Sequence, residues 1–164
     1  AADANAQRET DPTAARRGIR PLIYLDTSFV APMLLREAAS AKVERVLTRL
    51  SAGEAAVSHW TRTEFASAVA RRVRMGDLAS DDALRAIRSL DEIIERSIEL
   101  IAPVSEDFVA AQSIIVESDW QLRAGDALHL AIARARGASA LLTLDAVLLR
   151  VDGRFGIPIS TGSH

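Results

Sequence analysis

Short apolar runs recur along the sequence and are separated by longer stretches with helical periodicity. The runs are typical of buried strands, and they occupy residues 22–25, 55–58, 98–101 and 140–143, with a last candidate at 157–159. Between them, apolar residues recur at spacings of three and four, as in Val43, Val46 and Leu47. Strands connected by helices of ten or more residues pair in parallel, because a parallel connection must cross over. The pattern therefore predicts an α/β fold, a parallel sheet with helices on both faces.

The chain has 164 residues, the length of one ordinary domain. Residues 1–20 are polar and show no apolar periodicity, so we expect them to form a flexible N-terminal extension. We place the folded domain at residues 21–160 and expect residues 161–164 to form a flexible tail.

The sequence contains no cysteine, which excludes disulfide bonds and thiolate zinc sites. No apolar run approaches the roughly 20 residues that a membrane-spanning helix needs, and the N-terminus lacks the apolar segment of a signal peptide. We therefore expect a cytoplasmic protein that does not enter membranes.

The net charge of −2 neither supports nor excludes a nucleic-acid substrate. The positive charge is almost all arginine, whose planar group matches phosphate oxygens, but coding bias explains this equally well. Trp60 and Trp120 are candidates for stacking on unpaired bases, although packing is the simpler interpretation. The arginines that are either phosphate contacts or ordinary surface residues are Arg62, Arg71, Arg72, Arg74 and Arg123.

Four acidic residues stand where the predicted sheet would gather ligands. Asp26 directly follows the first strand, and Asp145 closely follows the fourth. Asp126 begins a helix behind Gly125, and Glu64 lies in the first turns of the helix after the second strand. Ligands of open parallel sheets bind outside the carboxyl ends of the strands, so all four acids can meet at one edge.

Clustered carboxylates repel one another unless a cation neutralises them, and Mg²⁺ or Mn²⁺ prefers oxygen ligands. The sequence therefore predicts a divalent-metal site whose catalytic and metal-binding residues are Asp26, Glu64, Asp126 and Asp145. Each acid also has a structural explanation: Asp126 and Asp145 can cap helices, and Glu64 can be a solvated helix residue. Asp26 is the hardest to explain in this way, because it ends a buried strand.

Three further residues lie near these acids. Ser28 and Thr143 are candidates for supporting roles at the same pocket, with helix capping and strand packing as the alternatives. His129 lies three residues after Asp126, but we interpret it as a packed or hydrogen-bonded structural histidine and assign no catalytic histidine.

Four segments of the sequence resemble the acidic motifs of PIN domains, and in particular the VapC toxins of VapBC toxin–antitoxin pairs. Their order and spacing fit over roughly residues 21–160. The segments are Ile23-Tyr24-Leu25-Asp26-Thr27-Ser28, Thr61-Arg62-Thr63-Glu64-Phe65, Gly125-Asp126-Ala127-Leu128-His129-Leu130-Ala131 and Thr143-Leu144-Asp145.

The resemblance implies a three-layer α/β/α PIN fold, RNA cleavage that depends on Mg²⁺ or Mn²⁺, a homodimer and inhibition by a cognate VapB-type antitoxin. Three alternatives remain. A phosphatase of the haloacid-dehalogenase type would use Asp26 as nucleophile, but Ser28 stands where such enzymes have a second aspartate. The others are a non-catalytic module that binds nucleic acid or a partner, and a housekeeping nuclease.

Overall fold

The computed structural model describes residues 21–117 and 119–162. The predicted flexible extension, residues 1–20, lies outside this part, as do the last two residues of the predicted tail. In chain order the elements are β1 (Ile23–Leu25), α1 (Thr27–Leu34), α2 (Ser40–Leu47), β2 (Ala55–Ser58), α3 (His59–Met75), α4 (Ser80–Ser97), β3 (Glu99–Ile101), α5 (Ser105–Val116), α6 (Ala124–Ala135), β4 (Ala140–Leu142), α7 (Ala146–Arg150) and β5 (Ile159–Ser160).

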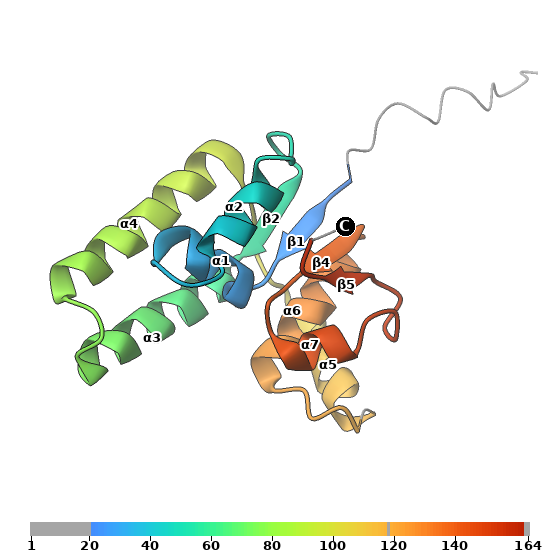
Figure 1. Cartoon of the computed structure of the whole chain (residues 1–164). Coiled ribbons are helices and arrows are strands. Elements are labelled where there is room, and N and C mark those ends of the chain that lie inside the picture. The colour runs from blue at the N-terminus through green and yellow to red at the C-terminus, as the bar shows by residue number, and fades with distance from the viewer. Residues whose placement is uncertain (1–20, 118, 163–164) are drawn as a thin grey trace, which may run out of the picture.

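The five strands form one sheet in the order β3-β2-β1-β4-β5, and every neighbouring pair is parallel. The first strand therefore lies at the centre, between the second and the fourth (Figure 1). Ile23 is in register with Ala55 on one side and with Ala140 on the other. This arrangement confirms the predicted parallel sheet, and it sets the ends of β1, β2 and β4 side by side.

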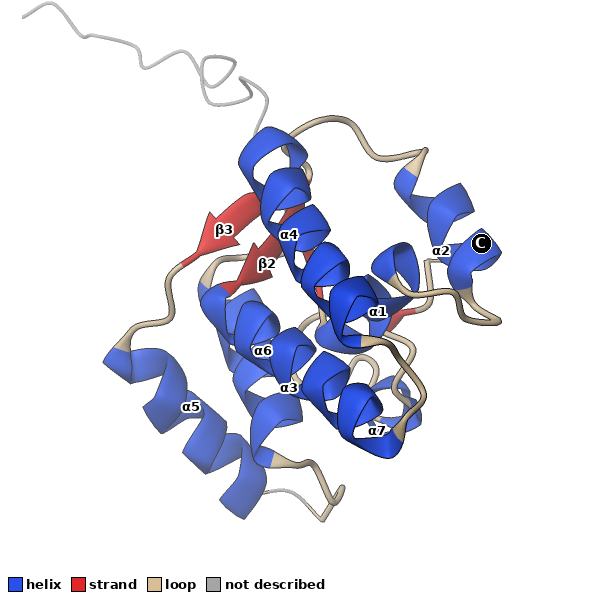
Figure 2. Cartoon of the chain, turned by 90° about the vertical axis from the view of Figure 1, so that its left-hand side faces the viewer, coloured by secondary structure: helices blue, strands red, loops and turns tan. Residues whose placement is uncertain are grey.

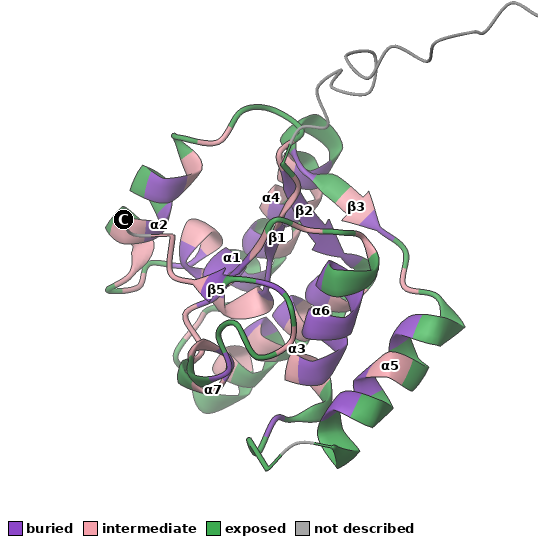
Figure 3. Ribbon diagram, turned by 90° about the vertical axis from the view of Figure 1, so that its right-hand side faces the viewer, coloured by how far each residue is buried: buried purple, intermediate pink, exposed green. Residues whose placement is uncertain are grey.

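Two apolar cores lie on opposite faces of the sheet, because successive strand residues point to opposite sides. Leu25 packs with α1 to α4, whereas its neighbour Tyr24 packs with α5 and α6. Figures 1 and 2 show these two groups of helices on either side of the strands. Most of α6 is buried, and α5 covers it from outside (Figure 3). The predicted three-layer α/β/α fold is confirmed.

The element boundaries differ from the prediction in details. The helix α5 begins at Ser105, with Val104 as its cap residue. The last strand occupies Ile159–Ser160 instead of residues 157–159. Pro158 has no N–H to give to a strand neighbour, which explains why the pairing begins after it. Within residues 21–117 and 119–162, no helix has the length and apolar character needed to span a membrane.

Candidate active site

The candidate site lies at the carboxyl ends of the three central strands. Asp26 follows β1, and Asp145 lies three residues after the end of β4. Glu64 is in the second turn of α3, the helix that starts directly after β2. Asp126 is in the first turn of α6. The structure thus places each predicted acid at the end of a strand or near the start of a helix.

Asp26 is buried and held on both carboxylate oxygens; only 4% of the residue is exposed. Its Oδ1 accepts hydrogen bonds from the Ser28 hydroxyl at 2.8 Å and from the backbone N–H of Phe29 at 3.0 Å. Its Oδ2 accepts one from the Thr143 hydroxyl at 2.8 Å. The bond from Phe29 makes Asp26 the N-cap of α1, so the capping role that was the alternative for Ser28 belongs to Asp26 itself.

Ser28 and Thr143 connect Asp26 to the loop that carries Asp145. The Thr143 hydroxyl accepts the backbone N–H of Asp145 at 2.9 Å, and the Ser28 hydroxyl accepts that of Leu144 at 2.8 Å. Both residues therefore contact the site as expected from the sequence, and they fix the loop after β4 against the end of β1. Their supporting role in catalysis stays a prediction.

Asp126 and Asp145 each use one carboxylate oxygen to cap a helix. Asp126 Oδ2 accepts the backbone N–H of Arg123 at 3.0 Å, at the start of α6. Asp145 Oδ1 accepts the backbone N–H groups of Val147 at 2.6 Å and Leu148 at 3.1 Å, at the start of α7. The capping explanation left open by the sequence is thus correct for both acids. It does not exclude a second role, because the other oxygen of each carboxylate makes no hydrogen bond within the described residues.

Glu64 is half-buried and points one oxygen towards the interior. Its Oε2 accepts hydrogen bonds from the Thr27 hydroxyl at 2.6 Å and from His129 Nε2 at 2.7 Å. Its Oε1 lies against the start of α6: a Cβ atom placed on Gly125 would stand 2.2 Å from it. Only glycine at position 125 therefore allows α6 to approach Glu64 this closely.

The charges of the acids influence one another. Partial burial raises the pKa of Asp126, the hydrogen bond from Arg123 opposes this, and the negative charges of Asp145 and Glu64 raise it further. Burial also raises the pKa of Asp26, against the lowering effect of His129 and of the hydrogen bonds it accepts. Burial acts in the same direction on Glu64, but the hydrogen bond and charge of His129 and the bond from Thr27 outweigh it and lower its pKa. Asp145 and Glu64 are therefore close enough to Asp126 for their charges to repel its own.

The donor set of this site suits a hard divalent cation. Within the described residues three carboxylates each have one oxygen that accepts no hydrogen bond by geometry, namely Glu64 Oε1, Asp126 Oδ1 and Asp145 Oδ2. The buried indole N–H of Trp60 lies beside Glu64 Oε1 and helps to lower the pKa of Glu64. Carboxylate oxygens are the ligands that Mg²⁺ and Mn²⁺ prefer. In the described part of the chain, however, no group of three or more acidic, histidine or cysteine side chains is arranged as a ready metal cage. Binding of one ion by all three oxygens would therefore require Asp126 and Asp145 to rotate towards Glu64.

The structure also places the residues for which the sequence left alternatives open. His129 is buried and hydrogen-bonded, which confirms its interpretation as a structural histidine. Arg62 and Arg72 form ion pairs with Asp91 and Glu37. Trp60 packs against the core between α5 and α6, whereas the half-exposed ring of Trp120 lies under the guanidinium of Arg154, with 5.2 Å between guanidinium carbon and ring centroid.

The sequence did not indicate the polar residues that hold His129. Tyr24 and Ser58 belong to buried strand segments, and their hydroxyl groups are 2.8 Å apart. The only sequence signal for Ser58 is its position before a helix, where it forms a reciprocal capping pair with Thr61. Nothing in the local pattern indicates that Tyr24 reaches His129, which is 105 residues away.

A parallel α/β sheet with four acids at its carboxyl edge defines a class of site that binds ligands where strands end. The sequence model of the PIN domain family matches residues 23–154, so the chain belongs to the PIN domain family. The resemblance drawn from the four motifs is thereby confirmed. No curated protein sequence matches the chain significantly.

Solved structures with the same fold include VapC proteins and toxin–antitoxin complexes. VapC20 of Mycobacterium tuberculosis, described as a sarcin–ricin loop cleaving toxin, is similar with a TM-score of 0.66 and 16% identity, over 79% of this chain and 94% of that chain. FitAcB of Neisseria gonorrhoeae gives 0.62 and 18%, over 87% and 99%. VapBC-1 of nontypeable Haemophilus influenzae gives 0.59 and 17%, over 87% and 99%. At these identities the likeness shows the fold.

Proposed function

We propose that the chain is a metal-dependent endoribonuclease that acts in the cytoplasm as the toxin of a type II toxin–antitoxin pair and inhibits translation and growth. The observation that carries the proposal is the clustering of Glu64 and Asp145 close enough to Asp126 for their charges to raise its pKa, beside the buried Asp26 of a PIN domain. Repelling carboxylates at a half-exposed edge are the arrangement that a cation neutralises.

The proposed reaction is hydrolysis of an RNA phosphodiester. A divalent ion, Mg²⁺ or Mn²⁺, bound by these acids would lower the pKa of a water molecule and offset the charge of the phosphate. The water oxygen forms a bond to phosphorus, the bond from phosphorus to the 3′-oxygen breaks, and that oxygen takes up a proton. Hydrogen bonds from Ser28, Thr143 and the backbone N–H of Phe29 fix the Asp26 side chain at the centre of the site. The products are a 5′-phosphate and a 3′-hydroxyl.

Cleavage of total cellular RNA by the purified chain, with mapping of the cut positions, tests the proposal. We expect cleavage with Mg²⁺ or Mn²⁺, and loss of cleavage in excess chelator and in the variants Asp26→Asn and Asp126→Asn. These variants remove charge but keep the shape of the side chain, so the fold is retained. Full activity in chelator or in both variants would contradict the metal site. Binding of RNA without cleavage would favour the non-catalytic alternative.

End-group analysis of a cleaved oligonucleotide by mass spectrometry tests the chemistry separately. A route through the 2′-hydroxyl of RNA relies on general acid–base residues, often histidines. His129 is buried and bonded through both ring nitrogens, which supports the water route instead. A 2′,3′-cyclic phosphate as primary product would overturn the mechanism even if RNA is the substrate.

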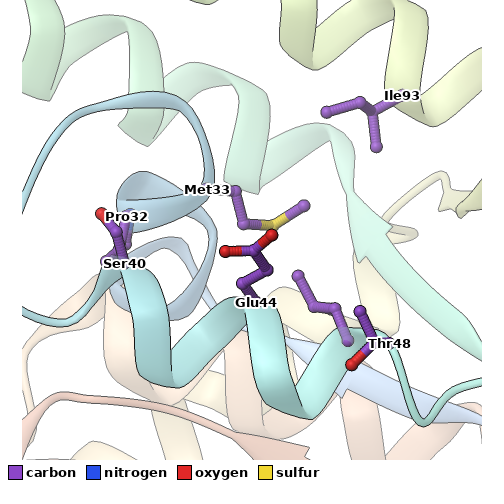
Figure 4. A pocket seen from close by; sticks show the side chains of 7 residues that line it. Pro32, Met33, Ser40, Glu44, Thr48 and Ile93 are labelled. Atoms are coloured by element: carbon purple, nitrogen blue, oxygen red, sulfur yellow. The ribbon is translucent and has the colours of Figure 1, made fainter.

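We further propose that an antitoxin of the VapB type binds this chain through an amphipathic helix. A hollow of about 520 Å³ lies between α1, α2 and α4 (Figure 4), where Ile93 of α4 faces Met33 of α1 and Glu44 of α2. Met33 and Ile93 also line two neighbouring hollows, so the groove continues along α4, lined by apolar residues and also by charged ones such as Arg72 and Asp82. Helices commonly bind partners by laying an apolar face into such a groove.

Growth assays test the partner. Expression of the chain should arrest growth, and co-expression of the adjacent small open reading frame should relieve the arrest. The variant Ile93→Glu places a charge in the groove, so it should abolish relief while RNA cleavage continues. If the unaltered chain never arrests growth, the housekeeping nuclease becomes the better interpretation.

A homodimer is also proposed. Three apolar residues of α5 support it, because they are exposed: Phe108 by 52%, Val109 by 63% and Val116 by 78%. Apolar side chains gathered on one helix face are typical of protein interfaces. Light scattering of the purified chain should give twice the monomer mass, and Phe108→Glu should reduce it to the monomer.

A further inference from the structure

His129 occupies an unusual place for a polar residue. It lies in α6 between the buried residues Leu128 and Leu130, and only 2% of it is exposed. Burying an imidazole without partners is costly, yet both ring nitrogens have partners here. Nδ1 is 2.8 Å from the Tyr24 hydroxyl, and Nε2 is 2.7 Å from Glu64 Oε2.

The direction of the bond to Glu64 follows from the chemistry of its partner. The pKa of Glu64 is lowered, so its side chain is a carboxylate, which only accepts hydrogen bonds. Nε2 of His129 is therefore the donor, as is the hydroxyl of Thr27 at the same oxygen. These two hydrogen bonds, both of 2.7 Å or less, hold Oε2 towards the interior of the protein.

The other oxygen of Glu64 is left in a different environment. Oε1 lies where the start of α6 passes closest, against Gly125 and one residue from Asp126. Asp126 feels the charge of Glu64, which raises its pKa. The carboxylate is thus divided: Oε2 is bound from within, and Oε1 stands beside the other acids.

We propose that His129 is a positioning residue that turns Glu64 so that Oε1 alone serves as a ligand oxygen. The inference rests on the proposed function, because the ligand in question is the divalent ion. Histidine suits this task since its ring bridges two layers: Nε2 holds Glu64 of α3, while Nδ1 is fixed by Tyr24 of β1. Tyr24 is in turn fixed by Ser58 of β2. Partners that orient metal ligands in this way tune affinity for the metal.

The Tyr24 end of this chain of bonds stays neutral. Burial raises the pKa of Tyr24 above its ordinary value of 10, more than its bonds to Ser58 and Thr61 lower it. The hydroxyl therefore keeps its proton at neutral pH and remains a partner for His129. The ring of His129 is held at a tilt of 59° to that of Tyr24, with 5.6 Å between their centroids.

The affinity of the full chain for Mn²⁺ tests the proposal. It is measured without RNA, from the electron paramagnetic resonance signal of the Mn²⁺ that stays free, for the unaltered chain and two matched variants. His129→Leu fills the space but removes the donor. His129→Gln restores a donor, since its amide nitrogen is as many bonds from Cβ as Nε2 is. We expect about tenfold or more weaker binding in His129→Leu and near-normal binding in His129→Gln. Equal, unaltered affinity in both variants, with thermal unfolding showing both folded, overturns the proposal.

A second measurement needs no metal and separates this proposal from the metal-dependent function. In proton–nitrogen spectra of the histidine rings, the Nε2 proton of His129 should give a slowly exchanging signal that is assigned by its loss in His129→Gln. That signal should be lost or shifted strongly in Glu64→Ala. If the chain binds no Mn²⁺ but this result holds, the metal site fails and the positioning of Glu64 stands. A signal unchanged in Glu64→Ala overturns the positioning role.

Discussion

Asp26 and Asp126 carry the same side chain at the same edge of the sheet, yet the fold commits them to different degrees. Asp26 is buried, and hydrogen bonds from three residues occupy both of its oxygens. Asp126 is half-buried and accepts a single bond, from a backbone N–H at its own helix start. The comparison separates two roles. Asp26 stabilises the structure of the site, whereas Asp126 has a carboxylate oxygen that is available to bind a ligand.

The largest effect should come from removing each acid in turn. Both Asp26→Ala and Asp126→Ala should abolish RNA cleavage, but only the first should strongly destabilise the fold. Asp26→Ala removes the N-cap of α1 and leaves the Ser28 and Thr143 hydroxyls without their acceptor, at a cost of about 2–3 kcal/mol. Asp126→Ala should cost less than about 1 kcal/mol, because lost repulsion offsets the lost cap.

Urea unfolding of both variants in chelator measures this difference, with the unaltered chain as reference. Equal losses of unfolding free energy in the two variants would show that Asp26 and Asp126 do not differ in their contribution to the fold.

A smaller effect is expected at the close approach of α6 to Glu64. Gly→Ala in a helix ordinarily stabilises by about 0.5–1 kcal/mol, but a Cβ at position 125 would stand 2.2 Å from Glu64 Oε1. Since Oε2 is held by Thr27 and His129, the carboxylate has little freedom to move aside. Gly125→Ala should therefore destabilise the chain by about 1–2 kcal/mol and reduce activity.

A double-mutant cycle with Glu64→Asp checks the cause. The aspartate is one methylene shorter, so Gly125→Ala should become neutral or stabilising in that background. A coupling energy of about 1 kcal/mol or more is expected for residues in contact. Additive effects would show that Gly125 is needed for a reason other than Glu64.

The smallest effect concerns pH in the absence of metal. The pKa of Asp126 is raised in the folded chain, so the folded state holds its proton more tightly than the unfolded state does. The free energy of unfolding should therefore decline as pH rises above the ordinary value of 3.8, through the raised pKa. The decline should be less than about 1 kcal/mol, because water screens a half-buried group.

Asp126→Asn should remove this decline of the unfolding free energy with pH. In the unaltered chain, added Mg²⁺ should offset the decline at neutral pH. Glu64 acts in the opposite sense, since its lowered pKa makes it lose stability only as pH falls below 4.5. Unfolding curves measured in chelator from pH 4 to 7 give the change of unfolding free energy with pH for the unaltered chain and for Asp126→Asn. Equal slopes would show that neither burial nor the charges of Asp145 and Glu64 raise the pKa of Asp126.

The positions of the acids were predictable because they depend on local rules. A buried strand ends where its apolar run ends, and Asp26 and Asp145 stand directly beyond two such runs. Parallel pairing then brings the ends together. The last strand was less exact: it was predicted at residues 157–159, but it pairs only after Pro158, at Ile159–Ser160.

The supporting hydrogen bonds were beyond such rules. The contact between Tyr24 and His129 joins two residues 105 positions apart, and each looks like an ordinary core residue in its own segment. The divided carboxylate of Glu64 depends equally on how closely α6 passes α3, a distance that periodicity does not contain. The sequence thus indicates which acids meet, and the packing of helices on the sheet decides which oxygen each one presents.

The central place of β1 has a consequence for how the protein comes into being. The strand is synthesised first, but its partner on one side, β4, comes after residue 139, and the bond from Thr143 to Asp26 spans 117 positions. A nascent chain therefore carries Asp26, Glu64 and Asp126 well before Thr143 and Asp145 exist to complete the edge. On the translating ribosome the site therefore stays incomplete until β4 and the loop that carries Asp145 have been made.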